Sequence, residues 1–275
     1  MSEQSTTTEG QARVGGMALS NGLLVHGPTS WAVAVRRDDG SVAVTSGRKP
    51  RLRLGPFERM PVLRGVLRLG EAMAVVPVAR FRSPEARLAL EHPGVGLTMV
   101  GTSILSALVK RRLSSGMARE TIGAIAGLAP SVVLLGRSEA AMWHAVEHKS
   151  IAAYEDGGAA GVANAADYAK EHQRCGSNLV LPLLTASAVG GAFGRRTGFG
   201  RTRRGRSSIA VVGSGIAVEA FAFAARRPEH PVSRAIHRSG HFLQEKFVTK
   251  EPAHDALGVG RAAIDELLRL EGRVA

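Results

Sequence analysis

The chain has 275 residues, with 36 Lys and Arg against 23 Asp and Glu, and a formal net charge of +13 at pH 7. So basic a balance predicts an acidic partner, such as nucleic acid or anionic lipid. Aromatic residues make up only 4% of the chain, which leaves little for base stacking, so we expect no nucleic-acid partner. The single cysteine excludes an internal disulfide and suits a reducing compartment.

The N-terminal part is predicted to combine a tail, a small β unit and a helix. The first 14 residues are polar and lack the apolar run of a signal peptide, so we expect a disordered tail and a cytoplasmic start. Residues 15–50 alternate in the manner of antiparallel strands, and the Asp-Gly pair at 39–40 is typical of a hairpin turn. Residues 51–55 could add a further strand, and an amphipathic helix is expected around 62–76.

Four stretches without a charged residue, except for Glu219, follow in two pairs. They are 93–109, 121–136, 177–194 and 207–225. Each is short of, or barely at, the roughly 20 residues with which a helix spans a bilayer. Buried helices of a soluble bundle would account for their Gly, Ser and Thr content, but close-packed membrane helices use the same small residues. We therefore predict two apolar helical hairpins in a mainly α membrane protein.

The loops of both hairpins are basic, and so are the segments that flank them, so the positive-inside rule does not decide the topology. Either the short helices enter the bilayer and return, or they cross it against the charge bias. Under both arrangements we expect the segment 137–176 to face the cytoplasm. The arginines of 195–206, and Lys149, are expected to contact the headgroups of anionic membrane lipid, with a solvated flexible loop as the alternative for 195–206.

The segment 137–176 contains the pattern His-x-x-Glu-His at 144–148. Because residues three and four apart share a helix face, His144, Glu147 and His148 would point the same way. The pattern is the inverted form of the zincin motif, in which two histidines bind zinc and the glutamate activates water. It predicts zinc, or another divalent metal, on His144 and His148, with Glu147 as the general base. A chance occurrence on an ordinary amphipathic helix is the alternative.

A second imidazole and thiol pair, His172 and Cys175, follows an expected helix at about 160–173. These side chains could complete a tetrahedral His/His/His/Cys site, which would be structural, or a three-ligand site with an open, hydrolytic position. Alternatively, Cys175 is a small buried side chain and His172 lies on the surface. Glu219 could be a distant carboxylate ligand or could pair with Arg174.

Further motifs surround this segment. Together with the two motifs of this segment, His144–Glu155 and His172–Ser177, they are Gly16–Ala18, His26–Pro28, Pro61–Val66, Ser239–Gln244 and Thr249–Pro252. Together they resemble the signatures of the bacterial YqhQ family from about residue 15 to the C-terminus, although Asn21 stands where that family usually has a glutamate. Its members are described as predicted metal-dependent membrane enzymes. The resemblance implies a place in the membrane and a metal site, but no substrate.

These observations divide the chain into six parts and lead to competing functions. The parts are a tail at 1–14, a β unit with an amphipathic helix at 15–92, a first apolar hairpin at 93–136, a metal-site segment at 137–176, a second hairpin at 177–225 and a soluble helical tail at 226–275. The main hypothesis is a zinc-dependent hydrolase that acts at the cytoplasmic membrane on an unknown substrate. The competing class is a non-catalytic membrane scaffold or assembly factor with a structural metal, and a transporter that uses Glu219 is a third. A homo-oligomer is compatible with each.

Overall fold

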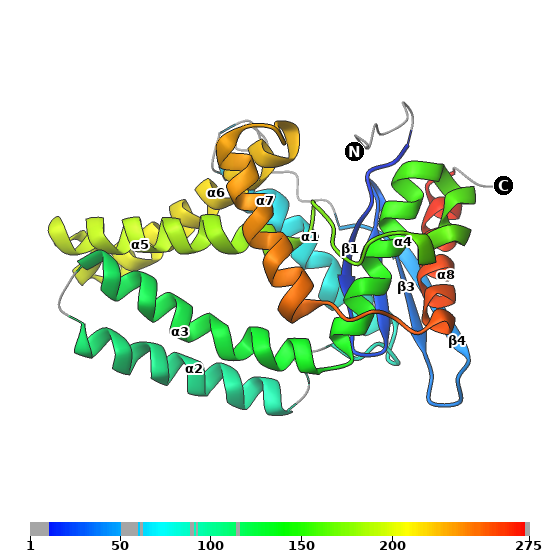
Figure 1. Cartoon of the computed structure of the whole chain (residues 1–275), viewed down its shortest axis with the longest axis horizontal. Helices are drawn as coiled ribbons and strands as arrows, with labels where there is room; N and C mark the ends of the chain where they lie inside the picture. Colours follow the sequence, from blue (N-terminus) through cyan, green and yellow to red (C-terminus); the bar gives the residue numbers. More distant parts are fainter. Residues whose placement is uncertain are drawn as a thin grey trace.

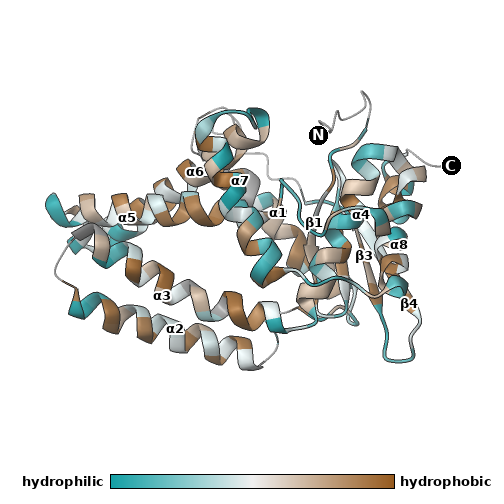
Figure 2. Cartoon of the chain, viewed as in Figure 1, coloured by the Kyte–Doolittle hydropathy of each residue, from teal (hydrophilic) through white to brown (hydrophobic). Residues whose placement is uncertain are grey.

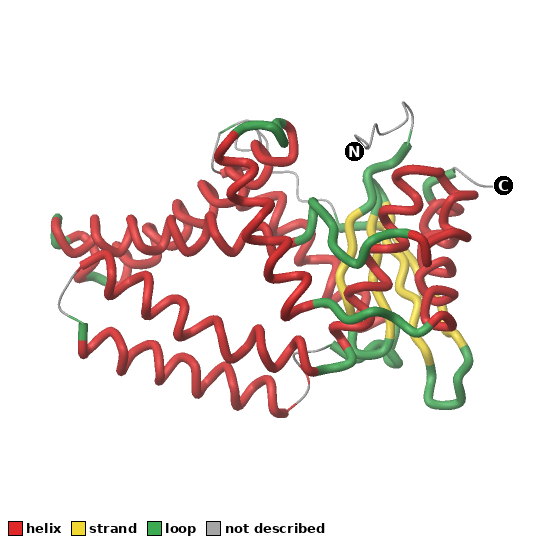
Figure 3. The backbone as a smooth tube through the Cα atoms, viewed as in Figure 1, coloured by secondary structure: helices red, strands yellow, loops and turns green. Residues whose placement is uncertain are grey.

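The computed structural model describes residues 11–50, 60, 63–88, 91, 93–113 and 116–272. The chain is mainly helical, with one small antiparallel sheet near the N-terminus (Figure 1 and Figure 3). The strands are β1 (Gly15–Ala18), β2 (Gly22–His26), β3 (Ser30–Arg36) and β4 (Val42–Arg48). The long helices are α1 (Leu63–Arg82), α2 (Pro93–Arg112), α3 (Gly116–Arg137), α4 (Ala140–Gly161), α5 (Val180–Arg196), α6 (Arg203–Arg226), α7 (Pro231–Leu243) and α8 (His254–Leu270). The expected β unit is confirmed, although the strand suggested at 51–55 lies outside the described residues.

The sheet is the middle layer between helices. Its strands pair in the order β1-β2-β3-β4, so neighbours in the chain are neighbours in the sheet. Side chains alternate along β3: Trp31 and Val33 lie in the core formed with α1, whereas Ala32 and Ala34 lie in the core formed with α4 and α8. Gly40 turns the chain between β3 and β4 with a φ of 84°, which glycine adopts without strain. Both faces are therefore covered, and α1, expected at 62–76, extends to Arg82 in order to cover one of them.

The two predicted hairpins are α2 with α3 and α5 with α6, and both extend away from the sheet (Figure 1). Three helical segments are long and apolar enough to cross a membrane, which is compatible with a membrane location: Ala118–Arg137, Gly176–Arg196 and Arg203–Arg226. In the part of the chain that the structure describes, α2 is not among them. Gly, Thr and Ser recur along α2 and dilute its apolar residues, as the mixed colours of Figure 2 show. Both expected hairpins are therefore present, and three of their four helices are candidates to cross a membrane.

Glu120 of α3 joins the two hairpins. Its carboxylate lies 3.0 Å from Nζ of Lys110 in α2 and also contacts the guanidinium of Arg195 in α5. Gly191 of α5 allows this close approach, because a Cβ there would lie 2.7 Å from Cγ of Glu120. Since α3 also packs against α5, the four helices form one arm rather than two separate hairpins.

Glu271 ties the end of α8 to the turn between β2 and β3. Its Oε1 accepts hydrogen bonds from the backbone N–H groups of Thr29 and Ser30 at 2.9 and 2.8 Å, and its Oε2 accepts one from the Thr29 hydroxyl at 2.9 Å. Gly27 leaves room for this carboxylate, because a Cβ there would lie 2.8 Å from Oε1. Burial acts to raise the pKa of Glu271, but these hydrogen bonds outweigh it and the pKa is lowered.

We expect Glu271→Gln to lower the free energy of unfolding at pH 7 by about 1 kcal/mol, because the hydrogen-bonded carboxylate is partly solvated. The folded-state pKa lies below the unfolded value of ~4.3, so the stabilisation is present above about pH 4.3 and is lost as the pH falls through the folded pKa. Urea unfolding at pH 7 and at pH 3 should show a difference between wild type and variant that shrinks at pH 3. Glu229→Gln, at an exposed position, serves as the control. A difference for Glu271→Gln that persists unchanged at pH 3 would show that the charged form of Glu271 is not what stabilises the fold.

Candidate metal centre

The site is carried by α4, which packs against β1, β2 and α8. Trp143 and Val146 are buried in the core that α4 shares with the sheet. The period of 3.6 residues places His144 and His148 on another face of the helix, with Glu147 between that face and Trp143. The spacing recognised in the sequence therefore becomes a set of neighbouring side chains, and the ring centroids of the two histidines are 4.3 Å apart.

Both histidines are oriented by backbone carbonyls. Nδ1 of His144 lies 2.9 Å from the carbonyl oxygen of Val248, and Nδ1 of His148 lies 2.6 Å from that of Lys170. A carbonyl oxygen only accepts, so each Nδ1 carries a proton that it donates, and Nε2 is the atom of each ring that could bind a ligand. Nε2 of His148 is buried and has no hydrogen-bond partner among the described residues. Metal-binding histidines show this arrangement, in which the second nitrogen donates to a carbonyl.

Cys175 brings a third donor atom to the two imidazoles. Its Sγ lies 3.2 Å from Nε2 of His144, and the donor atoms of His144, His148 and Cys175 all lie within 4.8 Å of one another. Burial raises the pKa of the Cys175 thiol, although the N–H of Ser177 donates to Sγ at 3.4 Å and acts in the opposite direction. A coordinated cation would deprotonate such a thiol. The three side chains form a compact group of two imidazoles and one cysteine sulfur.

Glu147 lies beside this group in a pocket closed by β1. Its side chain is 7% exposed, and burial raises its pKa to about 7, against the opposing effect of nearby His144. The backbone of Ala18 also hydrogen-bonds to the carboxylate. Gly16 makes room for it, because a Cβ there would lie 2.7 Å from both Cγ and Oε1 of Glu147. The Gly16–Ala18 motif therefore has a structural role as the wall of the Glu147 pocket.

The chain between α4 and Cys175 differs from the expectation. Gly158, with a φ of 64°, interrupts α4 shortly before the helix ends. The segment 160–173 is not one helix: it contains a short 3₁₀ helix, Val162–Asp167, followed by an irregular stretch up to Cys175. An irregular stretch follows no fixed period, so the direction of each of its side chains is decided by local contacts.

His172 lies next to the three-residue group but outside it. Its Nε2 is 3.1 Å from Oε2 of Glu155, and its Nδ1 accepts a hydrogen bond from the backbone N–H of Arg174 at 3.3 Å. Burial lowers the pKa of His172 to about 4, so the ring is neutral at pH 7. The Arg174 guanidinium contacts Glu155. Glu219, the other candidate ligand, lies half-buried on α6 and is not part of the group.

Lys149 does not face lipid headgroups, contrary to expectation. Its side chain is about 5% exposed, and Nζ donates to the carbonyl oxygens of Ala166 and Tyr168 at 3.1 and 2.7 Å. Nζ also lies 2.7 Å from a carboxylate oxygen of Glu251. These contacts hold the chain just before Lys170, whose carbonyl orients His148. A lysine among apolar residues of a helix predicts a surface position, and only its partners from other segments explain the burial.

Gln244 is a site residue that the sequence did not single out. Its Oε1 accepts from the N–H of His172 at 2.6 Å, and its Nε2 donates to the His172 carbonyl and to Oγ of Ser177 at 3.2 and 2.8 Å. Gln244 therefore hydrogen-bonds to the chain on both sides of Cys175. Gln244 also begins a π-helical turn, Gln244–Val248, whose last carbonyl accepts from His144. Turns of this kind occur often at functional sites. Its place in the Ser239–Gln244 motif was the available signal.

Comparisons with known proteins identify relatives without an assigned activity. A family model described as "Protein of unknown function (DUF1385)" matches residues 138–270, which contain the whole donor group. The chain is 24% identical over 295 residues to "Uncharacterized protein YqhQ" of Bacillus subtilis (strain 168), with 94% of this chain and 92% of the relative covered. No solved structure matches the chain. The chain is therefore similar to YqhQ over most of its length, and the donor group lies in the part that the family model matches.

Proposed function

We propose that this protein is a zinc-dependent hydrolase that acts at the cytoplasmic membrane on a substrate still to be identified. The observation that carries the proposal is the convergence of three donor atoms, one of which, Nε2 of His148, is buried without a partner among the described residues. Burying such an atom unsatisfied is costly, so a ligand is expected there. Glu147 lies beside this group, and a hydrolytic site is the function that gives a role to all four side chains.

The donor set suits zinc. Neutral imidazole and thiolate are its preferred ligands. Catalytic zinc centres typically have three protein ligands, for example three histidines or two cysteines with one histidine, and one open position. His144, His148 and Cys175 would hold the ion, with the two carbonyls of Val248 and Lys170 fixing the imidazole orientation. A bound zinc ion supplies Lewis acidity and makes water nucleophilic near neutral pH.

The chain's own residues would then do the proton transfer. Glu147, held between His144 and the wall at Gly16, would accept a proton from the attacking water and pass it to the leaving group. Gln244 and the Ser177 N–H would keep Cys175 directed at the imidazoles. The pocket excludes bulk water, which strengthens each of these interactions.

The position at the membrane rests on the helical arm. Three helical segments are suited to cross a bilayer, and the site segment lies between the two hairpins in the chain. We propose that this segment and the sheet face the cytoplasm, where a reducing environment keeps Cys175 as a thiol. The substrate would then carry a peptide bond or a lipid-derived bond that is presented at the membrane surface.

The decisive variant is Glu147→Gln. We expect it to reduce the hydrolysis of 4-nitrophenyl esters and fluorogenic peptide amides in detergent by about 100- to 10,000-fold, because a general base is lost. Its zinc content and helix content should equal those of the wild type. Glu139→Gln, an exposed carboxylate next to the start of the same helix, should retain full activity.

The same experiment tests the alternative. If Glu147→Gln hydrolyses the probes as fast as the wild type while zinc remains bound, the metal is structural and the protein is a membrane scaffold or assembly factor. In that case, removal of zinc by a chelator should unfold the site segment, which circular dichroism would detect.

A further inference from the structure

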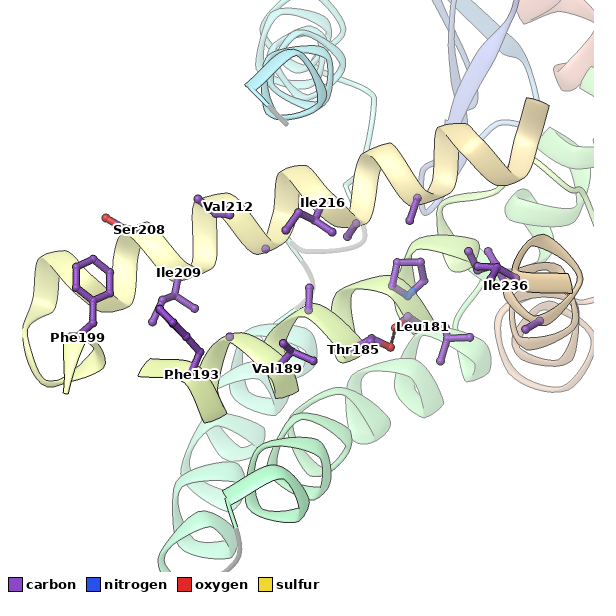
Figure 4. Close-up of a pocket in the computed structure, with 18 residues that line it drawn as sticks. Leu181, Thr185, Val189, Phe193, Phe199, Ser208, Ile209, Val212, Ile216 and Ile236 are labelled. Atoms are coloured by element: carbon purple, nitrogen blue, oxygen red, sulfur yellow. Dashed lines mark hydrogen bonds between the residues drawn. The ribbon is translucent and has the colours of Figure 1, made fainter. Parts of the chain in front are cut away.

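An apolar groove lies between α5, α6 and α7, and its lining contains no residue of the metal centre (Figure 4). Its volume is about 770 Å³, which is within the range of about 300–1,000 Å³ typical of ligand sites. Val212 and Ile216 of α6 lie across it from Val189 and Leu181 of α5, and Ile236 of α7 closes its inner end. The groove therefore follows two helices that are themselves suited to cross a membrane.

The lining of this groove offers almost nothing to a polar ligand. Thr185 and Ser208 are its polar side chains, and the Thr185 hydroxyl already donates to the Leu181 carbonyl of its own helix at 2.9 Å. No charged side chain lines the groove among the described residues. A polar molecule would lose its hydrogen bonds to water there without replacement. The space instead suits a hydrocarbon chain.

The outer end of the groove opens beside the most basic loop of the chain. Phe193 and Phe199 mark this end, and they are 56% and 50% exposed. The loop contains no acidic residue, and its arginines are all exposed: Arg195, Arg196, Arg201, Arg203, Arg204 and Arg206. Arg195 contacts Glu120 of α3, so the positive cluster rests on the other five. A positive cluster at the mouth of an apolar groove is complementary to an amphiphile with an anionic head and an apolar tail.

We propose that the groove binds an acyl chain of an anionic membrane phospholipid, whose phosphate headgroup lies at the arginines of 195–206. The lipid fills space that α5 and α6 leave open between them and anchors the tip of the hairpin at one membrane surface. This site uses no residue of the metal centre, so it stands independently of the hydrolase proposal.

The headgroup part is tested by native mass spectrometry of delipidated full-length protein in detergent, titrated with phosphatidylglycerol or phosphatidylcholine. The wild type should bind one phosphatidylglycerol at least about 10-fold more tightly than phosphatidylcholine, and the Arg203→Gln/Arg204→Gln double variant should lose that preference. Arg226→Gln/Arg227→Gln removes two exposed charges at the opposite end of α6 and should leave it unchanged. Equal binding of the two lipids by the wild type overturns the proposal.

The tail part is tested with two neighbouring valines of α6. Val212 lines the groove and Val211 does not, although they are similarly exposed, at 50% and 48%. Val212→Trp should fill the groove and weaken phosphatidylglycerol binding about 10-fold, whereas Val211→Trp should bind like the wild type. The proposal fails if the two variants bind phosphatidylglycerol alike. It also fails if Val212→Trp dissociates a dimer without changing lipid binding, because the groove would then hold a second copy of the chain.

Discussion

His148→Ala is expected to lower the affinity of the protein for zinc by more than about 100-fold. Loss of an outer partner of a metal ligand alone costs about 10- to 100-fold, and His148 supplies a donor atom itself. Its Nε2 is the buried atom for which the described residues provide no partner. Wild-type protein, purified in detergent and dialysed against buffered zinc, should contain about one equivalent by mass spectrometry.

Variants of the neighbouring side chains show which residues form the set. Cys175→Ala should also lose the ion, because it removes the one thiolate of the donor group. His172→Ala is the matched control: its imidazole is close, but both nitrogens are engaged by Glu155 and Arg174, so zinc should be retained. Loss of zinc in His172→Ala would enlarge the ligand set to four, and a wild type that binds no metal under any loading condition would remove the proposed enzyme.

Lys149→Met is expected to destabilise the protein by about 2–4 kcal/mol, because it removes charge-assisted hydrogen bonds to two carbonyls. Each kcal/mol lowers the melting temperature of a chain of this size by about 2–4 °C. The freed segment also carries the Lys170 carbonyl that orients His148. Thermal unfolding by circular dichroism should show the loss of stability, and zinc titration should show an affinity about 10-fold weaker.

An exposed lysine provides the comparison. Lys246, whose side chain is 56% exposed, forms an ion pair with its neighbour Glu245, so Lys246→Met should change the melting temperature only slightly. If Lys149→Met melts like Lys246→Met, the buried lysine contributes no stability and the 166–170 segment is held by other contacts.

The local pattern predicted the elements that the structure contains. Strand alternation and an Asp-Gly turn predicted the sheet, and uncharged runs predicted the helices of the arm. Helical spacing also predicted that His144, Glu147 and His148 share a face, because a helix repeats at a fixed angle whatever surrounds it. These features depend on residues close together in the chain, so the sequence alone was sufficient for them.

The choice of the third donor was decided by the tertiary structure. His172 and Cys175 lie in an irregular stretch, where no period sets the direction of a side chain. Gln244 and Glu155, from other segments, hold His172 away from the donor group, whereas Cys175 points towards His144. Burial of Lys149 likewise depends on carbonyls about 20 residues away in the chain. The sequence by itself determined which side chains one helix presents. Contacts between distant segments determined that Cys175, and not His172, reaches the two histidines of that helix, because those contacts exist only after the chain has folded.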